Sequence, residues 1–378
     1  MTTPSRPDAA RNASPFLFGG EAEAVAGALL SGQYGHTDVT ETFEKGVAAF
    51  LGVPETVAVT TGTAALHIAL VAAGVGPGCE VVVPSLTFCA TIQAILACGA
   101  NPRFVDVNPD TLCVEPEEIL GALTRATTAV MPVLFGGRAI DLSGIADTLQ
   151  ERGIAVIEDA AHAFGSFDGD VRVGATGALT CFSFGPIKNL TCGQGGMIVP
   201  RNAQEAQLAR SLRGLGIVES QARRAVTTSY SVERFGFRQQ LSSINAAIGN
   251  VQLANFDRAQ AGRKKLWRAY RAALAGLSSV KLVDVDVDNS VPHLCVVRVP
   301  YRDAVFEEMR ARGIGVGVHY PPNHQQRAFS SWHRKLPVTE RIAGEIMSLP
   351  FHPHMSEDEA VSVVEALKES LAVAGTQR

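Results

Sequence analysis

A lysine and an aspartate that each follow a short apolar run are the residues best placed to do chemistry. Lys188 comes soon after the run 179–184, and Asp159 follows the run 154–157. Functional side chains of α/β proteins gather where parallel strands end, so we expect the amine and the carboxylate to lie close together. Pyridoxal 5'-phosphate (PLP) needs such a pair, because a lysine binds it covalently and an acid keeps its pyridine nitrogen protonated. The two residues therefore suggest a PLP site.

A glycine-containing turn could hold the phosphate group of such a cofactor. Gly62 and Thr63 follow the apolar run 57–59 and open a predicted helix, so the N–H groups of the turn and the Thr63 hydroxyl are directed at an anion. A plain capped turn is the alternative. The sequence contains no G-x-x-x-x-G-K-[ST] motif, which excludes a P-loop nucleotide site.

Further polar and aromatic side chains complete the predicted site. Phe88 follows the predicted strand 81–83 and could stack on the cofactor ring, and Ser183 at a strand end could reach the phosphate. His162 comes three residues after Asp159 and could bond to the phenolic oxygen of the cofactor or to Asp159 itself. Two further residues are candidates to face the substrate: His319 and Tyr320.

Each of these residues also has a simpler explanation. Lys188 fits a solvated loop lysine, and Asp159 fits the N-cap of a helix. Phe88 fits core packing, and His162 fits an ordinary hydrogen-bonded helix histidine. Their joint occurrence with a phosphate-type turn favours the cofactor site.

The predicted elements form two domains after a short leader. Between residues 57 and 199, β-rich runs alternate with helical periodicity, which is typical of a mainly parallel sheet covered by helices on both faces. Residues 242–275 predict one or two long helices, followed by an α+β pattern of about 100 residues. We expect a flexible leader over residues 1–15, a large α/β domain over 16–250 and a small α+β domain over 251–378.

Composition excludes several other classes of protein. A net charge of -4 without a basic stripe argues against nucleic-acid binding, and no run reaches the ~18 apolar residues of a membrane span. The seven cysteines form no C-x-x-C pair and suggest reduced thiols in the cytoplasm. His352 and His354 flank a proline without a nearby carboxylate or cysteine set, so we expect no metal site.

The chain resembles the DegT/DnrJ/EryC1/StrS family of PLP-dependent sugar aminotransferases, a branch of the fold-type I enzymes related to aspartate aminotransferase. The resemblance covers nearly the whole chain after the leader. It rests on ordered motifs at residues 61–67, 83–88, 104–107, 158–162, 182–189, 193–196 and 349–353.

The resemblance implies a role for each candidate residue. Lys188 would be the Schiff-base lysine and proton shuttle, and Asp159 would pair with the pyridine nitrogen. His162 would lie beside the phenolic oxygen, and Phe88 would stack on the ring. The residues implied to hold the phosphate are Gly62, Thr63, Ala64 and Ser183.

The family also implies a homodimer in which each subunit completes the site of its partner. The asparagine that members of the family supply to the phosphate of the neighbouring subunit aligns here with Arg238. A guanidinium group binds phosphate in a planar fork, so we expect Arg238 to take over this role with different geometry.

The implied reaction is transfer of an amino group from L-glutamate to a keto group of a nucleotide-linked keto-deoxysugar, at C4, for amino-sugar, glycan or antibiotic biosynthesis. A C3-keto-sugar or keto-inositol aminotransferase and a PLP-dependent sugar lyase or dehydratase are the alternatives. Relatives that dehydrate sugars at C3 carry histidine at the position of Lys188, which favours amino transfer. A non-catalytic regulator would be expected to have lost Lys188 or Asp159, and both are present.

Overall fold

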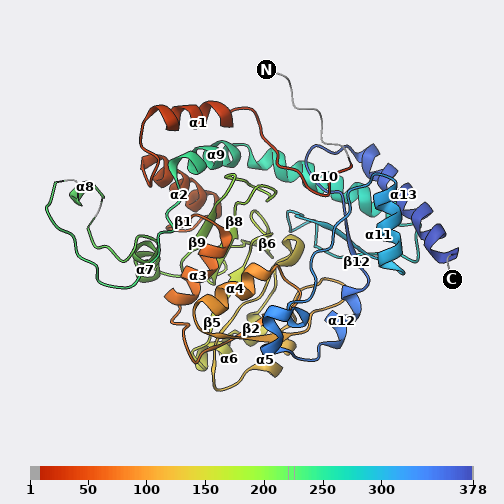
Figure 1. Cartoon of the computed structure of the whole chain (residues 1–378), viewed down its shortest axis with the longest axis horizontal. Helices are drawn as coiled ribbons and strands as arrows, with labels where there is room; N and C mark the ends of the chain where they lie inside the picture. The colour runs from red at the N-terminus through yellow and green to blue at the C-terminus, as the bar shows by residue number, and fades with distance from the viewer. Residues whose placement is uncertain (1–8, 220, 225, 377–378) are drawn as a thin grey trace.

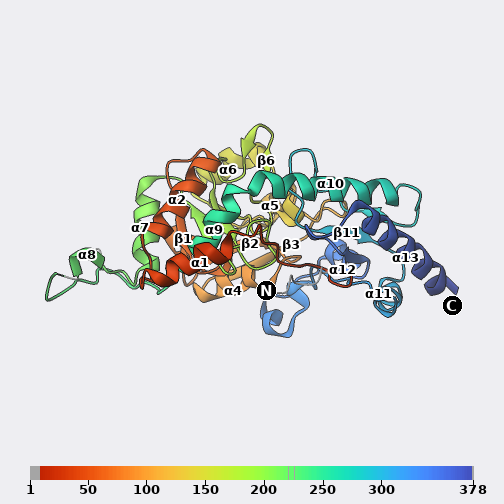
Figure 2. The same ribbon diagram turned by 90° about the horizontal axis from the view of Figure 1, so that it is seen from above.

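The computed structural model describes residues 9–219, 221–224 and 226–376. Its described part contains a seven-stranded sheet, a three-stranded sheet and a two-stranded hairpin. Figures 1 and 2 show the large sheet and its helices in the middle of an elongated molecule. Helix α13 (Glu357–Thr376) lies at one end, and the segment around α8 (Gln221–Arg224) projects from the other.

The large sheet is mainly parallel, with strand order β1-β9-β8-β5-β4-β2-β3. Strands β8, β5, β4, β2 and β3 run parallel to one another, whereas β9 is antiparallel to both β1 and β8. The strands are β1 (Val57–Val59), β2 (Glu80–Pro84), β3 (Asn101–Val105), β4 (Thr127–Val130), β5 (Ala155–Asp159), β8 (Leu179–Ser183) and β9 (Gly196–Val199).

Both faces of this sheet are covered by helices, because its strands are apolar on both sides. In β2, Val81 and Val83 pack with α3, α4 and α7, while Val82 packs on the opposite face with α5 and α6. Helices α2 and α9 cover the rest of that opposite face. The helices are α2 (Asp38–Leu51), α3 (Gly62–Ala72), α4 (Cys89–Ala97), α5 (Pro116–Ala122), α6 (Ala146–Glu151), α7 (Ala203–Arg213) and α9 (Ser243–Ala254). The predicted fold class is confirmed.

A second hydrophobic core belongs to the small sheet. Its order is β10-β11-β12, all antiparallel, and the core contains buried residues of α10, α11 and α13. The predicted boundary at residue 250 falls inside α9, so a helix leads into the small domain here. These elements are α10 (Phe256–Leu274), β10 (Lys281–Leu282), β11 (Cys295–Arg298), α11 (Arg302–Ala311), α12 (Pro337–Ala343) and β12 (Ile346–Leu349). Short 3-10 turns occur at Phe135–Gly137, Ser143–Ile145, Asn323–Gln325 and Arg327–Trp332.

The N-terminal segment is tied down where we expected a flexible leader. Asn12 Nδ2 donates to the carbonyl oxygens of Ser348 and Leu349 in β12, at 2.9 and 3.1 Å. Its own carbonyl oxygen accepts from the N–H of Phe351 at 2.9 Å. These contacts correct the prediction for residues 9–15, because the segment satisfies main-chain groups beside β12; the remainder of the predicted leader lies outside the described residues. Helix α1 (Glu21–Leu30) follows and packs on α9.

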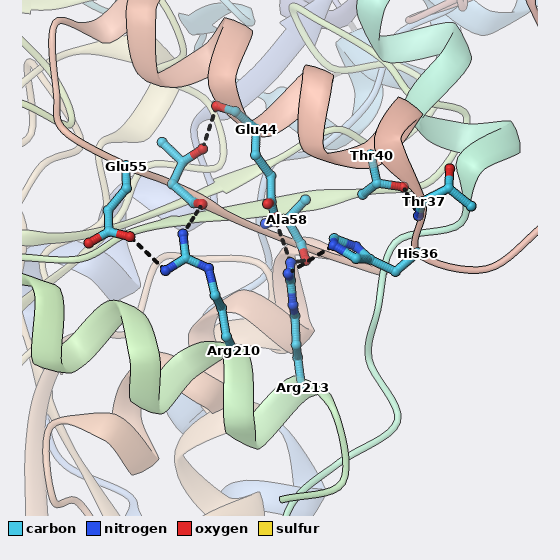
Figure 3. Close-up of polar contacts among 9 residues, drawn as sticks. His36, Thr37, Thr40, Glu44, Glu55, Ala58, Arg210 and Arg213 are labelled. Atoms are coloured by element: carbon cyan, nitrogen blue, oxygen red, sulfur yellow. Dashed lines mark hydrogen bonds and ion pairs between the residues drawn. The ribbon is translucent and has the colours of Figure 1, made fainter. Parts of the chain in front are cut away.

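Buried charges fix α2 and α7 against β1 (Figure 3). Arg213, at the end of α7, donates to the Glu44 carboxylate of α2 and to the carbonyl oxygen of Ala58 in β1. Glu44 also accepts from the N–H of Ala58 at 2.7 Å, so both charges are hydrogen-bonded as well as paired. Arg210, one turn earlier, binds Glu55 at 2.6 Å. This network anchors the root of the segment that projects after α7.

Two local features differ from the sequence prediction. A turn, not a helix, follows β5, so His162 lies in that turn and Asp159 does not cap a helix. A two-stranded hairpin of β6 (Phe167–Asp168) and β7 (Val171–Arg172) was not predicted. In the part of the chain that the structure describes, no helix is long and apolar enough to cross a membrane.

Candidate active site

A cavity of about 510 Å³ lies where the strands of the large sheet end. Asp159 is the last residue of β5 and Ser183 is the last residue of β8, so the carboxyl ends of two neighbouring parallel strands meet here. The cavity is lined by Thr61, Gly62, Thr63, Leu66, Thr87, Phe88, Ala90, Thr91, Val133, Asp159, Ala161, His162, Ser183, Pro186, Ile187, Lys188, Gln194, His319 and Tyr320. The structure therefore brings together most of the predicted site residues.

Lys188 is a partly buried amine opposite a buried carboxylate. Burial lowers the pKa of Lys188 to about 8, against the opposing influence of Asp159, and Arg263 lowers this pKa further. Burial raises the pKa of Asp159, although hydrogen bonds from Thr91 and Ala161 and the charge of Lys188 favour its ionised form. The pair provides an amine that exchanges its proton near pH 8 and an acid whose ionised form is favoured by hydrogen bonds and by a neighbouring cation.

Asp159 is held from two sides. Its Oδ2 accepts from the Thr91 hydroxyl at 2.7 Å, and its Oδ1 accepts from the N–H of Ala161 at 3.2 Å. Thr91 is itself bonded to Thr87 at 2.8 Å. A carboxylate has room for about four hydrogen bonds, so it retains acceptor capacity for a cationic group in the cavity.

The turn that opens α3 lies against the end of β8. A Cβ atom on Gly62 would come within 2.7 Å of Ser183 Cβ, so the close approach requires glycine. Thr63 is exposed on the cavity wall. The N–H of Ala64 is already bonded to the Thr61 side chain at 3.0 Å, and Ala64 does not line the cavity. Of the predicted phosphate residues, Gly62, Thr63 and Ser183 thus face the cavity, whereas the Ala64 N–H serves the helix cap.

Aromatic side chains also line the cavity. Phe88 is 57% exposed, so it does not pack in the core, and its ring centroid lies 5.7 Å from that of Tyr320. The Tyr320 hydroxyl is 3.1 Å from His162 Nε2. Since the N–H of Gly136 donates to His162 Nδ1 at 3.3 Å, Nε2 carries the ring proton and donates to Tyr320. Burial, with Lys188 and His319, places the pKa of His162 well below its usual range.

His319 is fixed from the small domain. Its Nδ1 lies 2.7 Å from the hydroxyl of Ser348 in β12. Burial lowers the pKa of His319 to about 4, with a further contribution from Lys188, so the ring is neutral at physiological pH. The small domain therefore supplies both His319 and Tyr320 to a cavity whose other residues come from the large sheet.

Besides Ala64, Arg238 is the predicted site residue that lies outside this cavity, and some residues near the cavity were not predicted. Arg238 is exposed at the base of the projecting segment and does not line the cavity. Sequence reasoning missed Thr91, which binds Asp159, and Gln194, which lines the wall. It also missed His293, which stacks on His162. Thr91 carries a weak signal, one turn into the helix after Phe88; Gln194 and His293 carry none that local pattern would reveal.

Comparison with known proteins identifies the family. Residues 19–368 match the model of the DegT/DnrJ/EryC1/StrS aminotransferase family. The chain belongs to this family. The seven-stranded sheet of this chain agrees with the fold-type I architecture of PLP-dependent enzymes. The predicted resemblance to the family is confirmed. The protein is therefore an enzyme, a PLP-dependent aminotransferase.

Solved structures of family members are similar over most of the chain. DesV from S. venezuelae, in complex with a ketimine intermediate, is 34% identical, with a TM-score of 0.86 over 92% of this chain and 93% of its own. The sugar aminotransferase CalS13 from Micromonospora echinospora is 29% identical, with a TM-score of 0.89 over 95% and 99%. Spr1654 from Streptococcus pneumoniae in its PLP form is 25% identical, with a TM-score of 0.89 over 96% and 98%.

The cavity of this DegT/DnrJ/EryC1/StrS enzyme fits PLP on its own geometry. Asp159 is buried and has acceptor capacity left for a protonated pyridine nitrogen. Gly62 leaves room for close approach at a helix N-terminus, where a phosphate group is stabilised. Lys188 offers an amine with a lowered pKa in the same cavity. The three requirements of the cofactor are met in one cavity.

Proposed function

We propose that this enzyme transfers an amino group from L-glutamate to the C4 keto group of a nucleotide-linked keto-deoxysugar. The observation that carries the proposal is the meeting of Lys188, Asp159 and the hydrogen-bonded pair of His162 and Tyr320 in one cavity. The likeness to the sugar aminotransferase CalS13 supports a sugar as acceptor. The choice of C4, of the nucleotide link and of L-glutamate rests on the sequence resemblance around Lys188, and a cytoplasmic location remains a prediction.

Asp159 and the turn at Gly62 would hold the cofactor. When bound, PLP supplies an electron-withdrawing ring that stabilises negative charge at the carbon next to the substrate nitrogen. Asp159 would keep a proton on the pyridine nitrogen, and the hydrogen bond from Thr91 would keep Asp159 oriented. Thr63 and Ser183 would bind the phosphate beside Gly62. Phe88 would cover one face of the ring.

Lys188 and Tyr320 would handle protons. With a pKa near 8, Lys188 has a substantial neutral fraction at physiological pH, so Nζ can take a proton from the substrate carbon and return it. The oxygen of Tyr320 accepts from His162, which leaves its own hydroxyl proton available to an oxygen in the cavity. Burial raises the pKa of Tyr320, so this hydroxyl keeps its proton. His319 would meet the substrate from the small-domain side.

A homodimer would complete each site. The described residues of the segment 215–240, which are all except 220 and 225, project from the body of the molecule in both views and expose large apolar side chains, including Phe235 at 87%. A second copy of the chain would bury this surface. The Arg238 side chain is exposed and has no hydrogen bond or ion pair with the residues that the structure describes, so it is available to the phosphate in the partner's cavity.

An absorbance experiment tests the proposed reaction. The PLP-loaded enzyme should show a band near ~420 nm that converts to one near ~330 nm when L-glutamate is added, and a nucleotide-linked 4-keto sugar should restore the first band. The Lys188→Ala variant should bind PLP without covalent attachment and lose at least about 10³-fold in the rate of this conversion. Rapid conversion by Lys188→Ala would remove Lys188 from the mechanism. A wild-type band that ignores L-glutamate would point to another amino donor or to a lyase.

A further inference from the structure

A buried histidine outside the cavity contacts one residue of the site, His162, and one neighbour of the site, Asn189. His293, just before β11, is 3% exposed and does not line the cavity. Its ring centroid lies 4.3 Å from that of His162, with 39° between the ring planes. On its other side, His293 Nδ1 lies 3.2 Å from Asn189 Oδ1. The small domain thus reaches both His162 and the residue next to Lys188.

The other hydrogen bonds of Asn189 show which atom donates in its contact with His293. Its Nδ2 donates to the carbonyl oxygen of His162 at 3.3 Å and to that of Val291 at 2.9 Å. Both amide hydrogens are therefore used, so Oδ1 can only accept, and His293 Nδ1 must carry the ring proton. Asn189 joins three segments that are distant in the sequence. Because it directly follows Lys188, this junction fixes the main chain that carries the reactive amine.

The main chain of Gly136 links the two histidines a second time. Its carbonyl oxygen accepts from the N–H of His293 at 2.8 Å, and its N–H donates to His162 Nδ1 at 3.3 Å. The same contact sets the tautomer in which His162 Nε2 donates to Tyr320. The main-chain position of His293 and the tautomer of His162 are consequently linked through one residue, Gly136.

We propose that His293 is a positioning residue that holds Lys188 in place through Asn189 and supports the ring of His162. It touches neither the cavity nor its contents, so it acts through these neighbours. The effect on catalysis should be large because displacement of a reacting group by about 1 Å can cost on the order of 10²-fold in rate. Burial, together with His162, Lys188, Arg263 and His319, lowers the pKa of His293 well below its usual range, which keeps the ring neutral. The inference rests on the proposed role of Lys188.

Two substitutions separate the hydrogen bond from the ring contact. His293→Phe keeps a flat ring beside His162 but leaves Asn189 Oδ1 without its donor. His293→Asn loses the ring but places an amide N–H close to the position of the original Nδ1. Each variant is prepared as the PLP-loaded enzyme. Its visible absorbance is recorded as a function of pH, and kcat and KM for L-glutamate are measured separately.

The hydrogen bond from His293 to Asn189 should matter more for catalysis than the contact between the rings of His293 and His162. We expect His293→Phe to shift the midpoint of the absorbance titration by about 0.5 pH unit or more and to lower kcat about tenfold, with KM within about twofold of wild type. His293→Asn should return the midpoint to within about 0.2 pH unit and kcat to within about threefold. A change in kcat and in the titration without a change in KM distinguishes a shift of Lys188 from general loss of structure.

Tyr270→Phe is the control for the loss of a buried hydrogen bond away from the cavity. Tyr270→Phe also removes one buried hydrogen bond, 2.7 Å long to the carbonyl oxygen of Pro350, but in the core of the small domain; it should lower Tm and leave the titration unchanged. Asn189→Leu breaks the contact from the other side and should reproduce the shift even if His293→Phe does not fold. A wild-type titration for either His293→Phe or Asn189→Leu, or equal impairment of His293→Phe and His293→Asn, overturns the proposal. A wild-type enzyme that ignores L-glutamate would instead contradict the proposed amino donor.

Discussion

Lys188 owes its reactivity to where its amine is buried. Removal from water destabilises the ammonium form, and the pKa falls to about 8 even though Asp159 stabilises the charge. Only the neutral amine attacks the aldehyde of PLP. The rate at which the apoenzyme captures PLP covalently should therefore rise as the pH increases through about 8 and level off above it, because the neutral fraction increases in that direction.

Stopped-flow absorbance between about pH 6.5 and pH 9.5 measures this dependence, with a correction for the ionisation of free PLP. Lys188→Arg is the control, since its side chain stays protonated throughout and should show no covalent capture. A rate that is still rising steeply at pH 9.5, as an ordinary lysine with a pKa of about 10.4 would give, would mean that the amine is solvated in the apoenzyme and that burial does not activate it.

The residues that sequence reasoning recovered are those whose role has a local pattern. Asp159 and Ser183 follow from the periodicity of buried strands, because side chains at strand ends converge on one edge of the sheet. Thr91 and His293 act through partners that are distant in sequence, Asp159 and His162 respectively. Such contacts depend on how helices and domains pack, which local periodicity does not specify.

At the scale of elements, the site depends on how closely the start of α3 approaches the end of β8. Gly62→Ala would place a Cβ within 2.7 Å of Ser183 Cβ and 3.2 Å of its Cα, so the helix must move away from the strand. We expect the Kd for PLP to rise about tenfold or more and the apoenzyme to lose about 1–3 kcal/mol of stability. Fluorescence titration with PLP and urea unfolding measure the two effects.

A second glycine provides the matched control. Gly262 lies exposed in α10, and a Cβ there would meet nothing within 4 Å. Gly262→Ala should leave PLP binding unchanged and stabilise the protein by about 0.5–1 kcal/mol, since alanine favours a helix interior. If Gly62→Ala behaves like Gly262→Ala, the approach of α3 to β8 is not what forms the phosphate cradle.

Elements with strong periodicity were predicted well, whereas connections were not. The interpretation of residues 242–275 as one or two long helices corresponds to α9 and α10. The turn after Asp159 and the ordering of residues 9–15 were missed. Residues 9–15 lack an apolar pattern of their own, and their order comes from hydrogen bonds to β12 that no local signal announces.

At the scale of the whole molecule, main-chain hydrogen bonds tie the end of the projecting segment 215–240 to the body of the molecule. The N–H of Thr60 donates to the carbonyl oxygen of Gln239 at 3.0 Å, and the N–H of Gln239 donates to that of Arg213 at 2.9 Å. Thr60 directly precedes the turn that opens α3, and Arg213 is held by the buried network of Figure 3. Arg238 is therefore an exposed residue at a base that is hydrogen-bonded to the body of its own subunit.

Mixing two impaired variants tests whether Arg238 serves the partner. In the proposed dimer each cavity combines Lys188 of one chain with Arg238 of the other, so Lys188→Ala and Arg238→Ala homodimers lack a complete site. A heterodimer of the two variants contains one cavity with both residues intact and one with neither. Random reassociation makes about half of the dimers mixed, and half of their sites complete, so activity should recover to about a quarter of wild type at saturating PLP. If Arg238 acted within its own chain, every intact Lys188 would lie beside the Arg238→Ala substitution, and mixing would restore nothing. Activity measured before and after reversible dissociation in urea decides between the two arrangements.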